Sequence, residues 1–200
     1  LAGTVETAVN ALWDAAPLLG DRVTVVGAGM VGCCVACLLR LFPVDVTLVD
    51  LDPARASVAA ALGVPFAGPE EAAGDRDLVV HTSATSAGLQ RSLELLAPEG
   101  TVLEMSWYGD TEVRVSLGGA FHSQRLGIRA SQVGTVSPRR AGSRTTADRL
   151  ALALDLLRDP AFDALITGSS PFEELPEVMP RLAAGSLPAL CHVITYNGAE

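Results

Sequence analysis

The sequence contains no lysine, so all fourteen of its basic side chains are arginine. Schiff-base catalysis needs a lysine amine, and the usual phosphate-binding loop ends on a lysine, so both kinds of site are excluded. The acidic residues leave a net charge of −9 without any basic tract. We therefore expect no nucleic-acid partner and no binding to an anionic membrane surface. The one basic cluster, Arg139 and Arg140 with Arg144, is predicted to be a solvated loop, with an anion site as the alternative.

Cysteine is also scarce, and its four positions do not make a metal site. Cys33, Cys34 and Cys37 crowd one helix-length segment, and Cys191 stands alone near the other end. A tetrahedral zinc site needs a second pair of ligands on loops, so no metal site is predicted. Small, reduced core residues are the better interpretation and indicate a cytoplasmic location. No signal peptide is recognisable, and the chain, which begins at Leu1 without methionine, is expected to be a piece of a longer protein.

One long uncharged run is present and raises the question of a membrane span. Residues 23–39 form a run of 17 residues without a charge. Three glycines interrupt the run, its first residues are β-branched, and Arg22 and Arg40 bracket it closely. These features favour a buried strand followed by a buried helix, and we expect no membrane segment here.

Strand-like and helix-like segments alternate along most of the chain, which is typical of an α/β fold. The order predicts a doubly wound parallel sheet (Rossmann) with six main strands and right-handed crossovers. Residues 1–170 would form this dinucleotide-binding domain, and residues 171–200 a C-terminal return segment. The main strands are expected at residues 21–26, 44–50, 64–67, 78–81, 101–105 and 126–131. Helices are expected at 7–15, 30–41, 53–62, 86–96, 145–157 and, interrupted by proline, 172–182. Residues 112–116 and 190–196 are predicted to be further strands, and 134–142 a flexible loop.

The strongest functional pattern lies between residues 23 and 50. A β-branched run meets Gly27, Gly29 and Gly32 in the spacing Gly-x-Gly-x-x-Gly, and a helix-length segment follows. Gly27 permits a sharp turn off the strand, Gly29 lets a pyrophosphate approach the backbone, and Gly32 lets the helix pack closely on the strand. The N-terminus of that helix would face the phosphates.

Asp50 ends the second strand-like run of this pattern. A carboxylate at this place can accept hydrogen bonds from both hydroxyls of an adenosine ribose, and it would repel a 2′-phosphate. NAD is therefore favoured over NADP. A glycine-rich turn without a ligand is the alternative, but strands, helix and terminal acid together favour a dinucleotide.

Ligands of such sheets bind at the carboxyl ends of the strands, so two further segments are candidates for contact with a cofactor. Thr82, Ser83 and Ala84 follow the strand expected at 78–81, and their small side chains would let a ribose approach the backbone. Backbone groups of Ser106 and Trp107 could hydrogen-bond a nicotinamide carboxamide. For each small residue, an ordinary turn is the alternative interpretation.

The three histidines are scattered and do not form a metal site. His81 ends a buried strand and is predicted to be a hydrogen-bonded structural residue, with a role beside the cofactor as the alternative. His122 is expected at the surface, with contact to substrate or a partner domain as the alternative, and His192 is expected to be structural. No serine lies on a Gly-x-Ser-x-Gly elbow, so no Ser/His/Asp triad is predicted.

Taken together, the segments between residues 2 and 196 resemble the medium-chain dehydrogenase/reductase family, the zinc-type alcohol dehydrogenase-like proteins. The resemblance rests on the glycine turn, on Asp50, and on a series of further segments in the same order. These segments are Thr7-Ala8-Val9-Asn10-Ala11-Leu12 before Gly20-Asp21-Arg22-Val23, Asp52-Pro53-Ala54-Arg55, Asp77-Leu78-Val79-Val80 before Thr82-Ser83-Ala84, residues 89–98 with Gly100-Thr101-Val102, and Phe172-Glu173-Glu174-Leu175-Pro176.

The resemblance implies the NAD-binding half of an oxidoreductase that transfers hydride between nicotinamide and an alcohol or carbonyl substrate. It adds Met30, Val31 and Arg55 to the cofactor-binding residues. A full-length member carries an N-terminal GroES-like domain, which would hold any zinc and receive the segment 171–200. By the same resemblance, Glu6 would face the nicotinamide region as a ligand or polar active-site group, with a helix-starting glutamate as the alternative.

The chain alone is therefore expected to bind NAD(H) without oxidising alcohols. The family often dimerises through the strand at residues 126–131, which implies a homodimer, although the residues themselves leave the oligomeric state open. A non-catalytic NAD-binding sensor or assembly module is the alternative function. A methyltransferase that uses S-adenosylmethionine is a weaker alternative, because the segments around residues 82–84 and 100–106 suit a dehydrogenase better.

Overall fold

The computed structural model describes residues 1–196, and a six-stranded sheet in the order β3-β2-β1-β4-β5-β6 forms its centre. All neighbouring strands in this sheet are parallel. The order reverses between β1 and β4, as in two joined mononucleotide-binding halves, and confirms the predicted doubly wound fold. The strands are β1 (Arg22–Val26), β2 (Asp45–Val49), β3 (Phe66–Ala67), β4 (Arg76–His81), β5 (Leu96–Glu104) and β6 (Gly127–Ala130).

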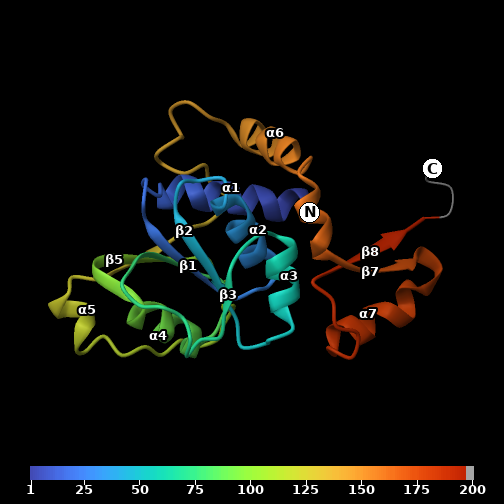
Figure 1. The fold of residues 1–200 in the computed structure, drawn as a ribbon. Helices are drawn as coiled ribbons and strands as arrows, with labels where there is room; N and C mark the ends of the chain where they lie inside the picture. Colours follow the sequence, from blue (N-terminus) through green and yellow to red (C-terminus); the bar gives the residue numbers. More distant parts are fainter. Residues whose placement is uncertain (197–200) are drawn as a thin grey trace.

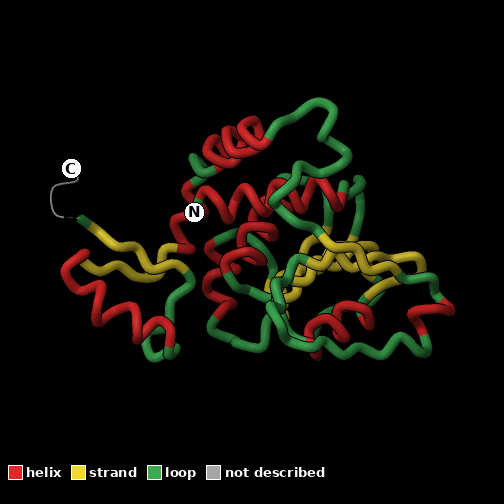
Figure 2. The backbone as a smooth tube through the Cα atoms, turned by 180° about the vertical axis from the view of Figure 1, so that it is seen from behind, coloured by secondary structure: helices red, strands yellow, loops and turns green. Residues whose placement is uncertain are grey.

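Helices cover both faces of this sheet (Figure 1 and Figure 2). On one face α1 packs against α2 and α6, while on the other face α4 packs against β4 and β5. The helical elements of this part of the chain are α1 (Ala2–Ala15), α2 (Met30–Leu39), α3 (Arg55–Ala61), α4 (Ser86–Glu94), α5 (Ala120–Ser123), α6 (Thr146–Leu156) and the 3-10 helix η1 (Pro160–Leu165).

The central strands are apolar on both sides because both faces are covered. Along β1, Val23 and Val25 join the core beneath α1 and α2, whereas Val26 joins the core beneath α4. Along β4, Val80 and Val79 divide between the two cores in the same way. This alternation explains why the sequence shows a continuous hydrophobic run at residues 23–26.

A small second unit follows the main sheet and lies beside it, past α3 (Figure 1). It contains β7 (Ile166–Pro171), the 3-10 helix η2 (Phe172–Glu174), α7 (Leu175–Ala183) and β8 (Cys191–Thr195). The two strands pair in parallel, so β8 has its partner, β7, within this chain. The predicted domain boundary at 170/171 falls inside β7, because sequence inspection missed this Thr/Gly/Ser-rich strand.

Several other expectations about elements need correction. Residues 112–116 form no strand; they run as a loop whose Val113 and Val115 pack against the core beneath α4. The alternating valines therefore reflect one-sided burial of a loop. The expected helix at 172–182 is divided into η2 and α7, and α7 contains Pro180.

The loop at residues 134–142 was expected to be flexible, but side chains of α1 and α6 hold its first part. The Ser137 N–H donates to Asn10 Oδ1 at 3.0 Å, and the Thr135 carbonyl accepts from Arg149 at 3.1 Å. Arg139 and Arg140 are exposed, as predicted for a solvated cluster. The loop is thus fastened at its start and solvated at its tip.

Candidate functional site

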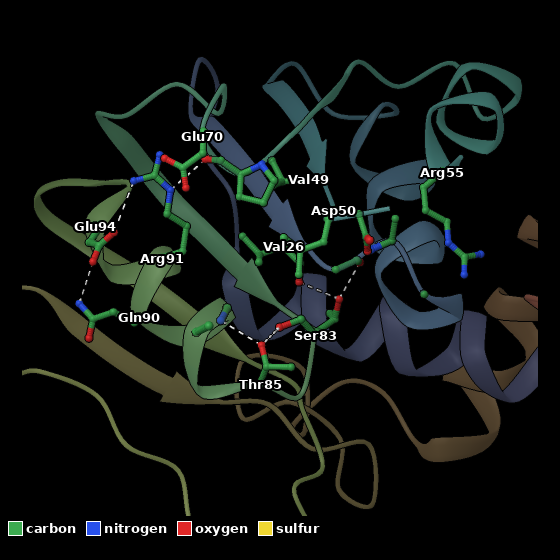
Figure 3. A pocket seen from close by; sticks show the side chains of 18 residues that line it. Val26, Val49, Asp50, Arg55, Glu70, Ser83, Thr85, Gln90, Arg91 and Glu94 are labelled. Carbon is green, nitrogen blue, oxygen red and sulfur yellow. Dashed lines mark hydrogen bonds and ion pairs between the residues drawn. The ribbon is translucent and has the colours of Figure 1, made fainter. Parts of the chain in front are cut away.

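A cavity of about 600 Å³ opens at the carboxyl ends of β1, β2 and β4 (Figure 3). Its volume lies within the range of small-molecule sites, which is roughly 300–1,000 Å³. The six cofactor-site residues from the sequence that line it are Gly27, Gly29, Asp50, Arg55, Thr82 and Ser83. Residues distant in sequence therefore meet at the switch point of the sheet, where ligands of such folds bind.

The bend after β1 depends on two glycines. Gly27 has φ +108°, and a Cβ there would come within 2.8 Å of the Ser83 nitrogen. At Gly32 a Cβ would fall 1.8 Å from the Gly27 carbonyl oxygen. Helix α2 therefore lies so close to the bend that only the hydrogen of a glycine fits between them. Thr82 secures the bend from β4, because its hydroxyl donates to the Val26 and Gly27 carbonyls at 3.1 and 2.9 Å. These contacts give Gly27 and Gly32 the roles expected from the spacing.

The N-terminus of α2 faces this bend without a side-chain cap. Gly29 is the N-cap residue and has no side chain that could accept a hydrogen bond, and a Cβ there would meet nothing within 4 Å. The open space at Gly29 and the unpaired N–H groups of the first turn form an anion-binding arrangement. Met30 and Val31 lie in this first turn but are not part of the cavity lining, so only their backbone N–H groups are suited to the site.

Asp50 points toward the bend from the end of β2. Its Oδ2 accepts from the Ala28 N–H at 2.6 Å, and its Oδ1 accepts from the Asp52 N–H at 2.9 Å. Each carboxylate oxygen keeps further acceptor capacity, because one bond uses only one of its lone pairs. The carboxylate can therefore accept additional hydrogen bonds from a ligand seated against the glycine bend.

Charged side chains flank the cavity on two sides (Figure 3). Arg55 lies past Asp50 and is paired with Asp52 at 3.3 Å. On the opposite side, Arg91 is paired with Glu94 at 3.4 Å and also donates to the Pro69 carbonyl. Both arginines of the lining are thus engaged by carboxylates of this chain.

The turn from β4 to α4 places Ser83 at the cavity wall. Ala84 has φ +52°, which turns the chain sharply, and Thr85 then caps α4 by accepting from the Gly88 N–H at 2.9 Å. The Ala84 N–H donates to Ser106 Oγ at 3.1 Å, which joins this turn to the segment after β5. Neither Ala84 nor Ser106 lines the cavity, and Trp107, which is 87% exposed, also lies outside it.

Beneath that turn, His81 is fully buried and is hydrogen-bonded at both ring nitrogens. Its Nε2 lies 2.7 Å from Ser83 Oγ, and its Nδ1 lies 2.7 Å from Glu104 Oε2. Glu104 also accepts from the Ser106 N–H at 2.7 Å and from the Tyr108 hydroxyl at 3.0 Å. We call Ser83, His81 and Glu104 the β4–β5 array.

The sequence predicted the hydrogen bonding of His81 but missed Glu104 and the serine–histidine–carboxylate order. One usable signal was present: His81 and Ser83 are two residues apart at a strand end and so project to the same side. Glu104 could not be assigned, because its position opposite His81 follows from the pairing of β4 with β5.

Glu6 lies away from the cavity and belongs to a different cluster. Its Oε1 is 3.0 Å from Arg149 Nε, and the Arg149 side chain is only 3% exposed. Arg149 also donates to Asn10 Oδ1 and to the carbonyls of Val133 and Thr135. The arrangement favours the alternative interpretation of Glu6, a structural glutamate of the first helix, here joined to α6.

Two structural findings bear on other classes of site. Within residues 1–196, no group of three or more His, Cys, Asp or Glu side chains is arranged to hold a metal ion. In the same part of the chain, every helix is too short or too polar to span a bilayer. Cys33, Cys34 and Cys37 are free and buried in the core, as predicted.

No protein-family model matches the sequence, and no curated protein matches it either. Solved structures do match the fold. L-idonate 5-dehydrogenase from Escherichia coli K-12 superimposes with a TM-score of 0.78 at 18% identity over 97% of this chain and 56% of its own. An alcohol dehydrogenase from E. coli CFT073 complexed with NADH gives 0.74 at 17% identity, over 96% of this chain and 57% of its own.

A third structure, 2R,3R-butanediol dehydrogenase from Bacillus subtilis, gives a TM-score of 0.72 at 17% identity, over 96% of this chain and 56% of its own. The chain thus spans little more than half the length of these proteins. It has the α/β fold of one half of such dehydrogenases.

Proposed function

We propose that this chain is the NAD-binding half of an alcohol dehydrogenase-like oxidoreductase and orients nicotinamide for hydride transfer with an alcohol or carbonyl carbon. The observation that carries the proposal is the contact of Asp50 with the Ala28 N–H, beside the uncapped N-terminus of α2. The likeness to dehydrogenases, one of them complexed with NADH, supports it. The cofactor supplies the hydride chemistry, and this chain binds and orients it.

The residues suit successive parts of a dinucleotide. The bend at Gly27 and Gly29, with the first turn of α2, would hold the pyrophosphate through backbone N–H groups. Asp50 would accept from the adenosine ribose hydroxyls. The nicotinamide half would then extend to the other side of the bend, over the ends of β4 and β5, where Ser83 and Ser106 stand.

Charge around the cavity favours NAD over NADP. A 2′-phosphate would lie next to the Asp50 carboxylate, with Glu70 and Glu94 also in the lining. Arg55, the cation on that side, is already paired with Asp52. Placing a phosphate among these carboxylates costs electrostatic free energy that NAD does not incur.

The replacement Asp50→Ala tests this role. We expect about ten- to hundredfold weaker NADH binding, because hydrogen bonds to a charged group contribute roughly 1.5–3 kcal/mol. Binding of NADPH should weaken less or improve, since the repelling charge is removed. Fluorescence titration of both reduced cofactors measures the two affinities.

Asp155→Ala is the matched control, because it removes an exposed carboxylate of α6 that forms only a surface pair with Arg158. It should leave both affinities unchanged. An unaltered ratio of NADH to NADPH affinity in Asp50→Ala would remove Asp50 from the proposed site. Failure of the unmodified chain to bind NADH at millimolar concentration would overturn the function itself.

A further inference from the structure

The β4–β5 array buries two polar side chains whose desolvation opposes folding, so a purely structural role explains it poorly. His81 is fully buried and the Glu104 side chain is only 13% exposed. Burying an imidazole and a carboxylate costs solvation free energy, and apolar side chains of similar volume often stabilise a core as well or better. One end of the array, Ser83, lines the cavity. This combination of buried polar groups and access to a ligand site calls for a chemical explanation.

The hydrogen bonds determine which ring nitrogen carries the proton. Burial opposes ionisation of Glu104, yet the bonds from His81 and from the Ser106 N–H lower the pKa of that carboxyl below its ordinary value. An ionised carboxylate only accepts, so His81 Nδ1 must donate to it. In the neutral ring Nε2 is then an acceptor, and the Ser83 hydroxyl donates to it.

We propose that the β4–β5 array is a proton relay that accepts a proton from the cofactor cavity. A hydroxyl bound in the cavity would give its proton to Ser83 Oγ while the Ser83 proton passes to His81 Nε2. The ring becomes an imidazolium, and the Glu104 carboxylate 2.7 Å away balances its charge. Oxidation of an alcohol by NAD⁺ yields a carbonyl, NADH and one proton, and the array takes up that proton.

The relay rests on the proposed function, because the dinucleotide orientation set by Asp50 brings the nicotinamide half to Ser83. The assignment to Ser83 and His81 is independent of substrate identity. Neither residue binds Asp50 or the glycine bend through its side chain, so the relay can be tested apart from cofactor recognition.

Glu104 is the charged side chain beside His81, and the other groups packed against the ring are neutral. Tyr108, in the segment after β5, stacks at 6.4 Å between ring centroids, and its hydroxyl lies 3.3 Å from Nδ1. Burial and the Glu104 charge raise the pKa of Tyr108 to about 12, so it stays neutral. Helix α4 approaches the ring with Gly88, where a Cβ would lie 2.9 Å from Nε2, and Val26 of β1 is the strand neighbour on the other side.

The start of α4 gives the Ser83 hydroxyl a second partner. Thr85 Oγ1 lies 3.0 Å from Ser83 Oγ, and a Cβ at Gly88 would fall 2.0 Å from that oxygen. When His81 is neutral, the Ser83 proton points to Nε2. When the ring is protonated, Nε2 donates, and Ser83 can direct its own proton to Thr85 or to a ligand. The two protonation states of the ring therefore reverse one chain of hydrogen bonds.

Proton exchange during cofactor binding tests the relay. Oxidised nicotinamide carries a positive charge and disfavours an imidazolium nearby, whereas reduced nicotinamide is neutral. We therefore expect NAD⁺ to release more protons than NADH on binding. Calorimetry in buffers of different ionisation enthalpy measures the count for each cofactor. His81→Gln should abolish the difference, and Glu104→Gln should reduce it, because the imidazolium loses its balancing charge.

His122→Gln is the matched control, because His122 is exposed and outside the array. It should keep the wild-type difference. Equal proton counts for NAD⁺ and NADH in the unmodified chain, or a difference that survives in folded His81→Gln, would overturn the relay.

A second readout needs no cofactor and keeps the relay testable if NADH does not bind. Nitrogen NMR of the His81 ring should show Nδ1 protonated in the neutral state, and Ser83→Ala should shift the Nε2 resonance. Ser57→Ala, on the surface of α3, should not. A neutral ring protonated at Nε2, or an Nε2 signal unaffected by Ser83→Ala, contradicts the array even where NADH binds normally. Absence of NADH binding with the expected ring signals contradicts only the proposed function.

Discussion

Position 32 accepts no side chain larger than hydrogen, because α2 crosses the bend after β1 there. A Cβ would lie 1.8 Å from the Gly27 carbonyl and 2.7 Å from the Thr82 hydroxyl oxygen. The same contact brings the N-terminus of α2 close to the bend that Gly27 forms. A Cβ added at position 32 would therefore disturb both the packing of α2 on the bend and the proposed phosphate site.

We expect Gly32→Ala to destabilise the chain by about 1–3 kcal/mol, because overpacking forces backbone shifts. NADH binding should weaken as well, since the bend moves with the helix. Urea unfolding and fluorescence titration measure the two effects. Gly3→Ala is the matched control: a Cβ at Gly3 in α1 meets nothing within 4 Å, and helix propensity predicts a small gain. Equal stability of the two variants would contradict the close packing at position 32.

At the scale of elements, one ion pair fastens the start of β1 to the start of β4. Asp77 accepts from the Arg22 backbone N–H at 2.8 Å and from two guanidinium nitrogens, each at 3.0 Å. The hydrogen bonds from the Arg22 side chain and backbone lower the pKa of Asp77 to about 2. Both side chains are more than a third exposed, so solvent screens much of this interaction.

The sign of the shift predicts how stability depends on pH. Asp77 has a lower pKa in the folded chain than the value of about 3.9 expected when unfolded. Its stabilisation is therefore complete above pH 5 and is lost as pH falls toward about 2. Asp77→Asn should be slightly less stable than wild type at neutral pH, with the gap closing in acid.

Thermal unfolding measured between pH 7 and pH 2.5 checks this expectation. Asp110→Asn, a change in an exposed loop, serves as the control for removal of one negative charge. A gap between wild type and Asp77→Asn that stays constant across the range would show that the carboxylate charge contributes nothing to the fastening.

Two segments illustrate why strand prediction failed at this scale. Residues 112–116 alternate like a strand, but only Val113 and Val115 face a core and no neighbouring strand pairs with them. In contrast β7 is rich in small polar residues and lacks a hydrophobic pattern, yet it pairs with β8 over its length. Periodicity reports burial of side chains, while a strand requires a partner for its backbone.

At the scale of the whole molecule, the exposure of the four cysteines shows which parts of the core exclude solvent. Cys33, Cys34 and Cys37 are at most 1% exposed, whereas Cys191 in β8 is half-buried. Burial raises the pKa of the Cys33 and Cys34 thiols to about 11 and about 12, so few thiolates are available for reaction.

We expect one fast-reacting thiol in the native chain at pH 8 and four in denaturant. Disulfide-exchange labelling with a chromogenic reagent gives both counts. Cys191→Ser should remove the fast phase and leave the slow ones, which require opening of the core. Rapid labelling of two or more thiols in folded Cys191→Ser would contradict a closed core around α2.

The sequence by itself determined the first strand, helix and second strand, the glycine bend between them and Asp50, because these features lie within one local β-α-β unit. Backbone freedom at Gly27, close approach at Gly32 and apolar runs on both sides are set by residue type and spacing. Only the tertiary structure decided the partners of buried polar groups. Glu104 meets His81 across 23 residues, Asp77 meets Arg22 across 55, and Glu6 meets Arg149 across 143. Such pairs depend on which strands and helices become neighbours. Local sequence patterns do not predict a contact between residues so far apart in the chain.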